Sequence, residues 1–323
     1  MSYPSIPYKP IGILYEHPCW FKPLFEELLR RHIPFVRINA AHHQYNPAEK
    51  ETPFSMVVNR VSPTAHFRGH GAALQHTLNY LHHLEGLGVR VINGSTPFEI
   101  ELSKARQINI FQQLGLPFPR TRIVNHLDQI LPASFSLRYP LLVRPVTGGN
   151  GLGVYRFEQP GQLQKAIQLR QVSLGPDHHA LIQEYIRPYK QVIIHAEIRR
   201  RRFFRAWTLP ATGAVHVDGG KGTVAWHERK EFQPESAIIH QLNQIAERAA
   251  LDFGSVDLVT SEETRSAVYL TIDAIGSLTD VHPDIFQPQS VSLAEYLEEE
   301  WRRLTDPSAA DSSSIHNTIP LLQ

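Results

Sequence analysis

The chain is poor in cysteine, in net charge and in long apolar runs. Cys19 is the only cysteine among 323 residues, so no internal disulfide can form, which fits a reducing compartment. The 32 basic and 31 acidic residues give a net charge of +1, which excludes a global field for nucleic acid or membranes. No apolar run approaches the ~20 residues that span a bilayer, and the N-terminal segment has no signal or transit pattern. We therefore predict a cytoplasmic globular protein.

Two common nucleotide-binding motifs are also absent. The chain contains no G-x-x-x-x-G-K-[ST] sequence, which excludes a Walker loop. A glycine loop does follow the apolar run that ends at Arg144, but its spacing is not that of a dinucleotide fingerprint. The segment after the loop, Val154–Phe157, has the composition of a strand rather than a helix. The glycines of the loop are Gly148, Gly149, Gly151 and Gly153.

A glycine loop between two strands favours a flap that closes over a phosphate group. Residues without a Cβ atom reach positive φ and let backbone N–H groups converge on an anion. Arg144, on the preceding strand, would add positive charge at the same place. An ordinary hairpin turn also favours glycine, so the loop alone does not decide between the two.

Further segments flank the loop in a definite order and favour the nucleotide. Before the loop, residues 103–121 contain an amphipathic helix that is opened by Lys104. After it comes an apolar strand with one carboxylate, Glu184. Two later strands contain the acidic residues Asp257 and Asp273.

In this order, the segments resemble the ATP-grasp superfamily and, within it, the RimK-like carboxylate–amine ligases, over residues 90–300. The family has a lysine on the helix before a G-[IL]-P-x-P-x-T stretch, which Lys104 matches. Its V-K-P strand is matched by residues 143–145, and its R-V-E-V strand by residues 195–198. Its Q-E-[YF]-[IV] hinge, which holds adenine, is matched by Gln183, Glu184, Tyr185 and Ile186.

The resemblance implies an α/β architecture: an ATP-grasp fold of two α+β lobes clasping ATP, preceded by a small parallel α/β domain. It implies ATP and Mg²⁺ as cofactors and the ligation of a small-molecule or peptide carboxylate to an amine through an acylphosphate. Lys104, Arg144 and the loop glycines would hold phosphates, and residues 183–186 would hold adenine. Asp257 and Asp273 would hold magnesium.

Four positions depart from the family pattern. Arg144 stands in place of the flap lysine and His195 in place of a strand arginine that faces the phosphates; these two are the candidate catalytic residues. Thr271 replaces the bridging carboxylate, and Asp273 replaces an asparagine two residues along the same strand face. Magnesium prefers oxygen ligands and tolerates water, so we expect one ion on Asp257 and Asp273. The alternative is a non-catalytic or weakly active ATP-binding module.

Strand–helix alternation with short links predicts a parallel α/β domain over residues 1–96. We expect the lobe with the glycine flap over residues 97–188 and the lobe with the metal strands over 189–304. A final helix is predicted over Val291–Leu304, capped by Ser292. Residues 305–323 are rich in serine and are predicted to be disordered.

Basic residues and histidines outside these motifs leave several alternatives open. Arg60 and Arg68 follow a predicted strand, where α/β folds place ligands, so they are candidates for a substrate carboxylate, with an ordinary surface loop as the alternative. The run Arg199–Arg202 lies beside aromatic residues; a solvated hairpin tip is favoured over nucleic-acid binding. The adjacent histidine pairs do not favour zinc, because neighbouring side chains point apart. The sequence leaves a homo-oligomer open.

Overall fold

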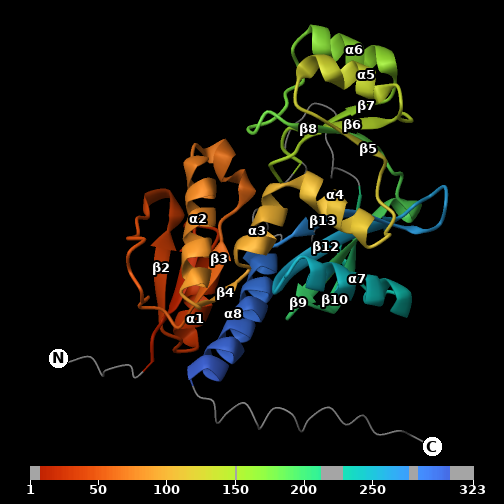
Figure 1. Cartoon of the computed structure of the whole chain (residues 1–323). Helices are drawn as coiled ribbons and strands as arrows, with labels where there is room; N and C mark the ends of the chain where they lie inside the picture. Colours follow the sequence, from red (N-terminus) through yellow and green to blue (C-terminus); the bar gives the residue numbers. More distant parts are fainter. Residues whose placement is uncertain (1–7, 150, 212–227, 276–282, 306–323) are drawn as a thin grey trace, which may run out of the picture.

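The computed structural model describes residues 8–149, 151–211, 228–275 and 283–305, with the side chains of 283–289 left aside. Their strands form three sheets that follow one another along the chain (Figure 1). The tail beyond residue 305, predicted to be disordered, lies outside the described residues. None of the described helices combines the length and the apolar composition that crossing a bilayer requires.

The first sheet is parallel and has the order β2-β1-β3-β4, as the alternating pattern predicted. Apolar residues of β1 and β3 fill both faces, which is typical of a parallel sheet covered by helices. The elements are β1 (Ile11–Tyr15), α1 (Lys22–Arg30), β2 (Phe35–Asn39), β3 (Met56–Arg60), α2 (Ala72–Gly86) and β4 (Arg90–Ile92), with 3₁₀ helices at Ala40–His42 and Pro63–Arg68.

The second sheet is antiparallel, has the order β5-β8-β6-β7 and contains the glycine loop between β6 and β7. Two short helices pack on one face of it and close its own core (Figure 1). The elements are β5 (Thr121–Val124), a 3₁₀ helix (Leu127–Gln129), α5 (Ile130–Ser134), β6 (Leu141–Pro145), β7 (Tyr155–Phe157), α6 (Pro160–Gln168) and β8 (Ala180–Glu184).

The third sheet is antiparallel and has the order β11-β10-β9-β12-β13. Its apolar residues alternate with polar ones, so one face packs on two helices while the other presents polar side chains. The elements are a 3₁₀ helix (Tyr189–Gln191), β9 (Val192–Arg199), β10 (Arg202–Pro210), β11 (Lys230–Phe232), α7 (Ser236–Arg248), β12 (Phe253–Thr260) and β13 (Ala267–Asp273).

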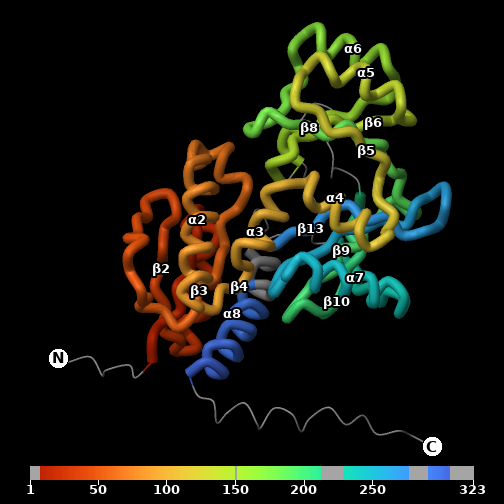
Figure 2. The backbone as a smooth tube through the Cα atoms, in the orientation of Figure 1, coloured from red at the N-terminus to blue at the C-terminus, as the bar shows by residue number. Residues whose placement is uncertain are grey.

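The remaining helices join the sheets to one another. The helices α3 (Ser95–Leu102) and α4 (Lys104–Gln113) contribute Ile100 and Phe111 to the core of the third sheet. Helix α8 (Pro283–Thr305) places Leu297 in the core of the first sheet, between the first and third sheets (Figures 1 and 2). The boundaries expected at residues 96 and 188 stay predictions.

The last helix begins earlier than predicted. Helix α8 starts at Pro283, so Ser292 lies inside it, and the predicted cap at Ser292 is wrong. The prediction began the helix at Val291, although a proline inside a helix, such as Pro288, is unfavourable only because it removes one hydrogen bond and crowds the preceding turn. The backbone continues through Pro288, and Pro283 occupies the helix start, where a proline is well tolerated.

Candidate functional site

Three adjacent strands bring the predicted metal and catalytic residues to one face of the third sheet. His195 on β9 lies opposite Asp257 on β12, and Asp257 lies opposite Thr271 on β13. Asp273 follows two residues after Thr271 and therefore lies on the same face. The neighbours of these residues along the strands, such as Val256 and Ile272, point to the helix-covered core.

Asp257 is the centre of this group. Its Oδ1 lies 2.7 Å from His195 Nδ1, and its Oδ2 accepts a hydrogen bond of 3.3 Å from the Thr271 hydroxyl. His195 is buried, whereas the Asp257 carboxylate is about one-third exposed, so a ligand can still reach that carboxylate. Burial favours the neutral imidazole, but the Asp257 carboxylate, with Glu197 and Asp273 further away, raises the pKa of His195.

Two cations, Lys104 and Arg144, lie close to this face. Lys104 opens α4, and its backbone N–H donates to the carbonyl of Val146, which fastens the helix start to the end of β6. Burial lowers the pKa of Lys104, with Glu101 opposing and Arg144 adding to the effect, and burial also lowers the pKa of Arg144 to about 10.

Among the described residues, the Arg144 guanidinium has no counter-ion of its own. Its Nε atom is shut off from solvent and makes no hydrogen bond. Across the described part of the chain, no carboxylate lies within ion-pair distance of either Lys104 or Arg144. A buried cation without a partner is costly, so this arrangement is complementary to an anion that binds there.

Glu101 is a further acidic residue beside the site, and the sequence analysis missed it. Its Oε2 accepts a hydrogen bond of 2.6 Å from the backbone N–H of Ala274, directly after the metal strand. Burial and the nearby Asp273 raise its pKa to about 8. Glu101 lies near the end of α3 and Lys104 opens α4 after the extended residue Ser103, so no local helical pattern marked Glu101 out.

The glycine loop has the backbone that the flap prediction required at three of its four positions. Gly148, Gly151 and Gly153 have φ values of +152°, +72° and +71°. Gly149 does not have a positive φ; a Cβ there would lie 3.3 Å from the Thr64 methyl group. The start of the loop therefore lies against the Pro63–Arg68 helix, which belongs to the unit built around the first sheet (the first unit).

The predicted adenine hinge is at the end of β8. The Gln183 amide donates to the Thr121 hydroxyl over 2.9 Å. The Glu184 carboxylate is buried, accepts from the Arg138 backbone N–H at 2.9 Å and forms ion pairs with Arg120 and Arg138. Glu184 therefore holds the neighbouring strands together. The backbone N–H of Tyr185 donates to the Pro140 carbonyl, and Ile186 follows in the loop, partly buried.

The two arginines predicted for a substrate carboxylate are not equivalent. Arg60 is fully buried and donates to the carbonyls of Ala274 and Ile275, after β13. Arg68 forms an ion pair with Glu16 and donates to the Thr64 hydroxyl, beside the glycine loop. Arg60 therefore joins the first unit to the third sheet, and only Arg68 lies beside the loop.

Glu16 organises a small polar cluster that the sequence did not reveal. It follows β1, is almost fully buried and contacts both Arg68 and His70. Burial opposes ionisation, but the hydrogen bonds from Arg68 and His70 outweigh it and lower the pKa of Glu16. The signal was its place after a parallel strand, the edge at which such sheets assemble their sites.

The arginine run on the β9–β10 turn is neutralised by protein carboxylates. Arg199 and Arg200 pair with Glu299 of α8, and Arg201 pairs with Asp252. Three of its four arginines are thus committed within the chain, which does not suit a nucleic-acid surface.

Over the described ranges no group of three or more His, Cys, Asp or Glu residues could hold a metal ion. A magnesium ion on Asp257 and Asp273 therefore needs ligand or water oxygens as well.

Comparisons with known proteins show which proteins this chain is similar to. No protein-family model matches the chain. A segment of 128 residues, 38% of this chain, is 30% identical to the carbamoyl phosphate synthase large chain of Mycobacterium sp. (strain JLS) and spans 11% of that protein. A segment of 104 residues is 28% identical to D-alanine–D-alanine ligase of Pseudomonas putida (strain GB-1) and spans 32% of each protein.

Solved structures match over almost the whole chain. An ATP-grasp RimK domain protein from Sphaerobacter thermophilus DSM 20745 has a TM-score of 0.63 at 16% identity, covering 89% of this chain and 98% of the other. D-cycloserine synthetase DcsG has a TM-score of 0.65 at 17% identity, covering 90% and 99%. The ATP-grasp ligase PsnB, complexed with minimal precursor, Mg and ADP, has a TM-score of 0.62 at 12% identity, covering 93% and 100%. The chain has the ATP-grasp fold, in the form that RimK-type proteins share, as its motifs predicted.

Proposed function

We propose that the chain is an ATP-dependent carboxylate–amine ligase that acts through an acylphosphate. The observation that carries this proposal is a pair of cations, Lys104 and Arg144, near the carboxylates of Asp257 and Asp273. No carboxylate of the described residues forms an ion pair with either cation. Phosphate groups would satisfy the cations, and a divalent ion would satisfy the carboxylates. The matched proteins named as ligases and synthetases support the same class of reaction.

The protein groups would act by position and charge. Lys104 and Arg144 would hold the phosphates while the N–H groups of the glycine loop cover them. The substrate carboxylate would attack the γ-phosphate, ADP would leave, and the amine would then displace phosphate from the acylphosphate to give an amide. The chain would supply little covalent chemistry of its own, since orientation and charge compensation suffice for such a transfer.

The donor set fits a magnesium ion. Asp257, Asp273 and the Thr271 hydroxyl present hard oxygen atoms on one strand face, which is the ligand type that Mg²⁺ prefers. When bound, the ion would neutralise charge on the phosphate oxygens. His195 would orient the Asp257 carboxylate through the 2.7 Å contact and keep one of its oxygens in place.

Glu16, Arg68 and His70 are the proposed substrate groups of the first unit. Arg68 contacts Thr64, whose methyl group faces Gly149 of the loop, so the cluster adjoins the expected γ-phosphate. A carboxylate and a cation held together suit a substrate that has both an amine and an acid group. The precursor peptide named in a PsnB complex supports a peptide as well as a small molecule.

One experiment tests both the ligase and its alternative. Purified protein is incubated with magnesium-ATP and a panel of amino acids and short peptides, and phosphate release and melting temperature are measured. We expect stabilisation by ATP, since a ligand that binds only the folded state raises the melting temperature, and turnover with at least one acid–amine pair. Asp257→Asn should abolish the magnesium dependence of the stabilisation by ATP and of the turnover.

The second candidate, an ATP-binding module without turnover, is favoured by one observation. Thr271 cannot bridge two metal ions as a carboxylate does, although it lies directly opposite Asp257. Thr271→Glu should strengthen metal binding and raise turnover if the chain is a ligase. A variant that binds ATP and metal tightly but remains inert with every acid and amine would favour the module.

A further inference from the structure

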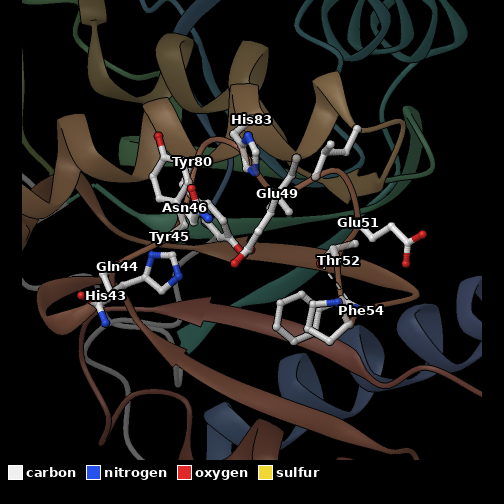
Figure 3. A pocket seen from close by; sticks show the side chains of 13 residues that line it. His43, Gln44, Tyr45, Asn46, Glu49, Glu51, Thr52, Phe54, Tyr80 and His83 are labelled. Carbon is white, nitrogen blue, oxygen red and sulfur yellow. Dashed lines mark hydrogen bonds between the residues drawn. The ribbon is translucent and has the colours of Figure 1, made fainter.

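A cavity apart from the candidate site lies along helix α2, in the unit built around the first sheet. Residues 43–54, which lead from β2 to β3, form one wall and α2 forms the other (Figure 3). The cavity has a volume of about 500 Å³, and ligand-binding cavities commonly measure ~300–1,000 Å³. None of the residues assigned above to ATP, metal or substrate lines this cavity.

Several aromatic rings line the cavity. Tyr45 packs against Tyr80 and His83 with ring centroids 5.0 Å apart in each case, and Tyr80 packs against His43 at 4.3 Å. Phe54 lies at the opposite end of the cavity (Figure 3). The ring pairs are tilted, and the faces of tyrosine rings are electron-rich and attract cations as well as apolar groups.

The fixed charge of the lining is negative. Glu49 and Glu51 line the cavity, and neither lysine nor arginine does. Glu49 extends toward Tyr45, whereas Glu51 turns outward (Figure 3). Within the described ranges, neither carboxylate forms an ion pair with a basic residue. Glu49 is exposed at the rim of the cavity, and its negative charge adds to burial in raising the pKa of Tyr80.

His43, which lines the cavity, does not neutralise this charge. His43 Nδ1 and His76 Nε2 lie 3.0 Å apart, and a hydrogen bond between two ring nitrogens requires that one of them has no proton. At least one imidazole of the pair is therefore neutral. Burial and the neighbouring His76 lower the pKa of His43 to about 4, in agreement with this geometry.

We propose that this cavity binds an organic cation, an alkylammonium or guanidinium group on a flexible chain. Tyr45 and Tyr80 would face the cation, and Glu49 would neutralise it. The same chemistry occurs in a free polyamine and in a lysine or arginine side chain of a peptide. The cavity lies entirely on the first unit, so this binding does not depend on ATP or on the proposed ligase reaction.

The test is calorimetric titration of the full chain, without ATP, with four probes: spermidine, N-acetyl-lysine methylamide, N-acetyl-arginine methylamide and the neutral N-acetyl-norleucine methylamide. We expect at least one cationic probe to bind at millimolar concentration or tighter and the norleucine probe not to bind. Tighter binding of spermidine would identify a free polyamine as the source, and tighter binding of the amino-acid probes would identify a peptide.

Matched variants locate the binding. Glu49→Gln should weaken it about fivefold or more, because the lining carboxylate that extends toward Tyr45 loses its charge. Tyr45→Leu should weaken it while keeping the volume apolar. Glu26→Gln, on the exposed side of α1, is the control and should leave affinity unchanged. Three results would each overturn the proposal. The norleucine probe could bind as well as the cations, the cations could still bind the variant that combines Glu49→Gln with Tyr45→Leu, or no probe could bind.

Discussion

Arg144 shows how a single residue can favour ligand binding while it lowers the stability of the ligand-free protein. Its Nε atom is enclosed and makes no hydrogen bond, and its pKa is lowered by burial. A protein without its ligand bears this desolvation cost, which is why such groups gather at functional sites. Stability and binding should therefore respond to this residue in opposite directions.

We predict that Arg144→Met removes ATP binding but not folding. Losing a charge-assisted hydrogen bond costs ~1.5–3 kcal/mol, so the affinity for magnesium-ATP should fall about tenfold or more. The melting temperature without ligand should be unchanged or higher. Differential scanning fluorimetry with an ATP titration measures both. Arg122→Met, on exposed β5 of the same sheet, is the control; an equal loss of affinity there, or undiminished binding in Arg144→Met, would refute the role.

His43 should make the free energy of unfolding depend on pH. Its pKa is about 4 in the folded protein, below the usual 6.5, so the unfolded chain takes up the proton first as the pH falls. The stabilisation is complete above pH 6.5 and is lost as the pH falls toward 4. After allowance for partial exposure it amounts to roughly 1–2 kcal/mol.

Urea unfolding at pH 7.5 and pH 4.5 measures this contribution. His43→Gln should lose less stability between the two values than the wild type does, and His42→Gln, exposed next to it, should match the wild type. Equal losses in all three proteins would show that His43 titrates alike in the folded and unfolded states.

At the scale of elements, the glycine loop has backbone angles that favour glycine at particular positions. Gly151 has a φ of +72°, a conformation that costs a residue with a Cβ about 1–2 kcal/mol. Gly161, in α6, has ordinary backbone and open space around its Cα. The two glycines provide a matched pair.

We predict that Gly151→Ala weakens the affinity for magnesium-ATP by about five- to thirtyfold while the fold survives, because that strain falls on the closed loop. Gly161→Ala should leave the affinity as it is. Isothermal titration at equal protein concentration makes the comparison. If both variants bind like the wild type, the loop is a hairpin turn and does not cover phosphates.

Local pattern predicted the elements well and their partners less well. Alternation along β13 predicted that Thr271 and Asp273 share a face, and the Thr271 hydroxyl does meet Asp257 of the neighbouring strand. The same pattern could not tell that α4 packs on the third sheet, because periodicity identifies an apolar face but not the surface that covers it. Glu16 and Glu101 were missed for a related reason: each becomes distinctive only through residues distant in sequence.

At the scale of the whole molecule, a few buried polar contacts join the first unit to the third sheet. The Asn93 amide donates to the carbonyls of Phe253 and Ala274, and its oxygen accepts from the Asp252 backbone N–H. Arg60 contacts the same segment after β13. The strand end that contains Asp273 is thus held from the first unit, so the position of the metal ligands depends on this junction.

We predict that Asn93→Ala destabilises the protein by about 3 kcal/mol or more, because it leaves several buried backbone groups without partners. Calorimetry should resolve two unfolding transitions where the wild type shows one. Asn79→Ala, exposed on α2, should behave like the wild type. A single transition at the wild-type temperature in Asn93→Ala would show that the units are coupled mainly by other contacts.

The position of α8 in the core of the first sheet has a consequence for biosynthesis. Leu293 and Leu297 pack with Ile11 and Leu24, residues that the ribosome makes far earlier. At ~5–20 residues per second, roughly 15–60 s separate the synthesis of these two parts. During that interval the apolar surface of the first unit remains uncovered, which makes the nascent chain a natural client for a chaperone.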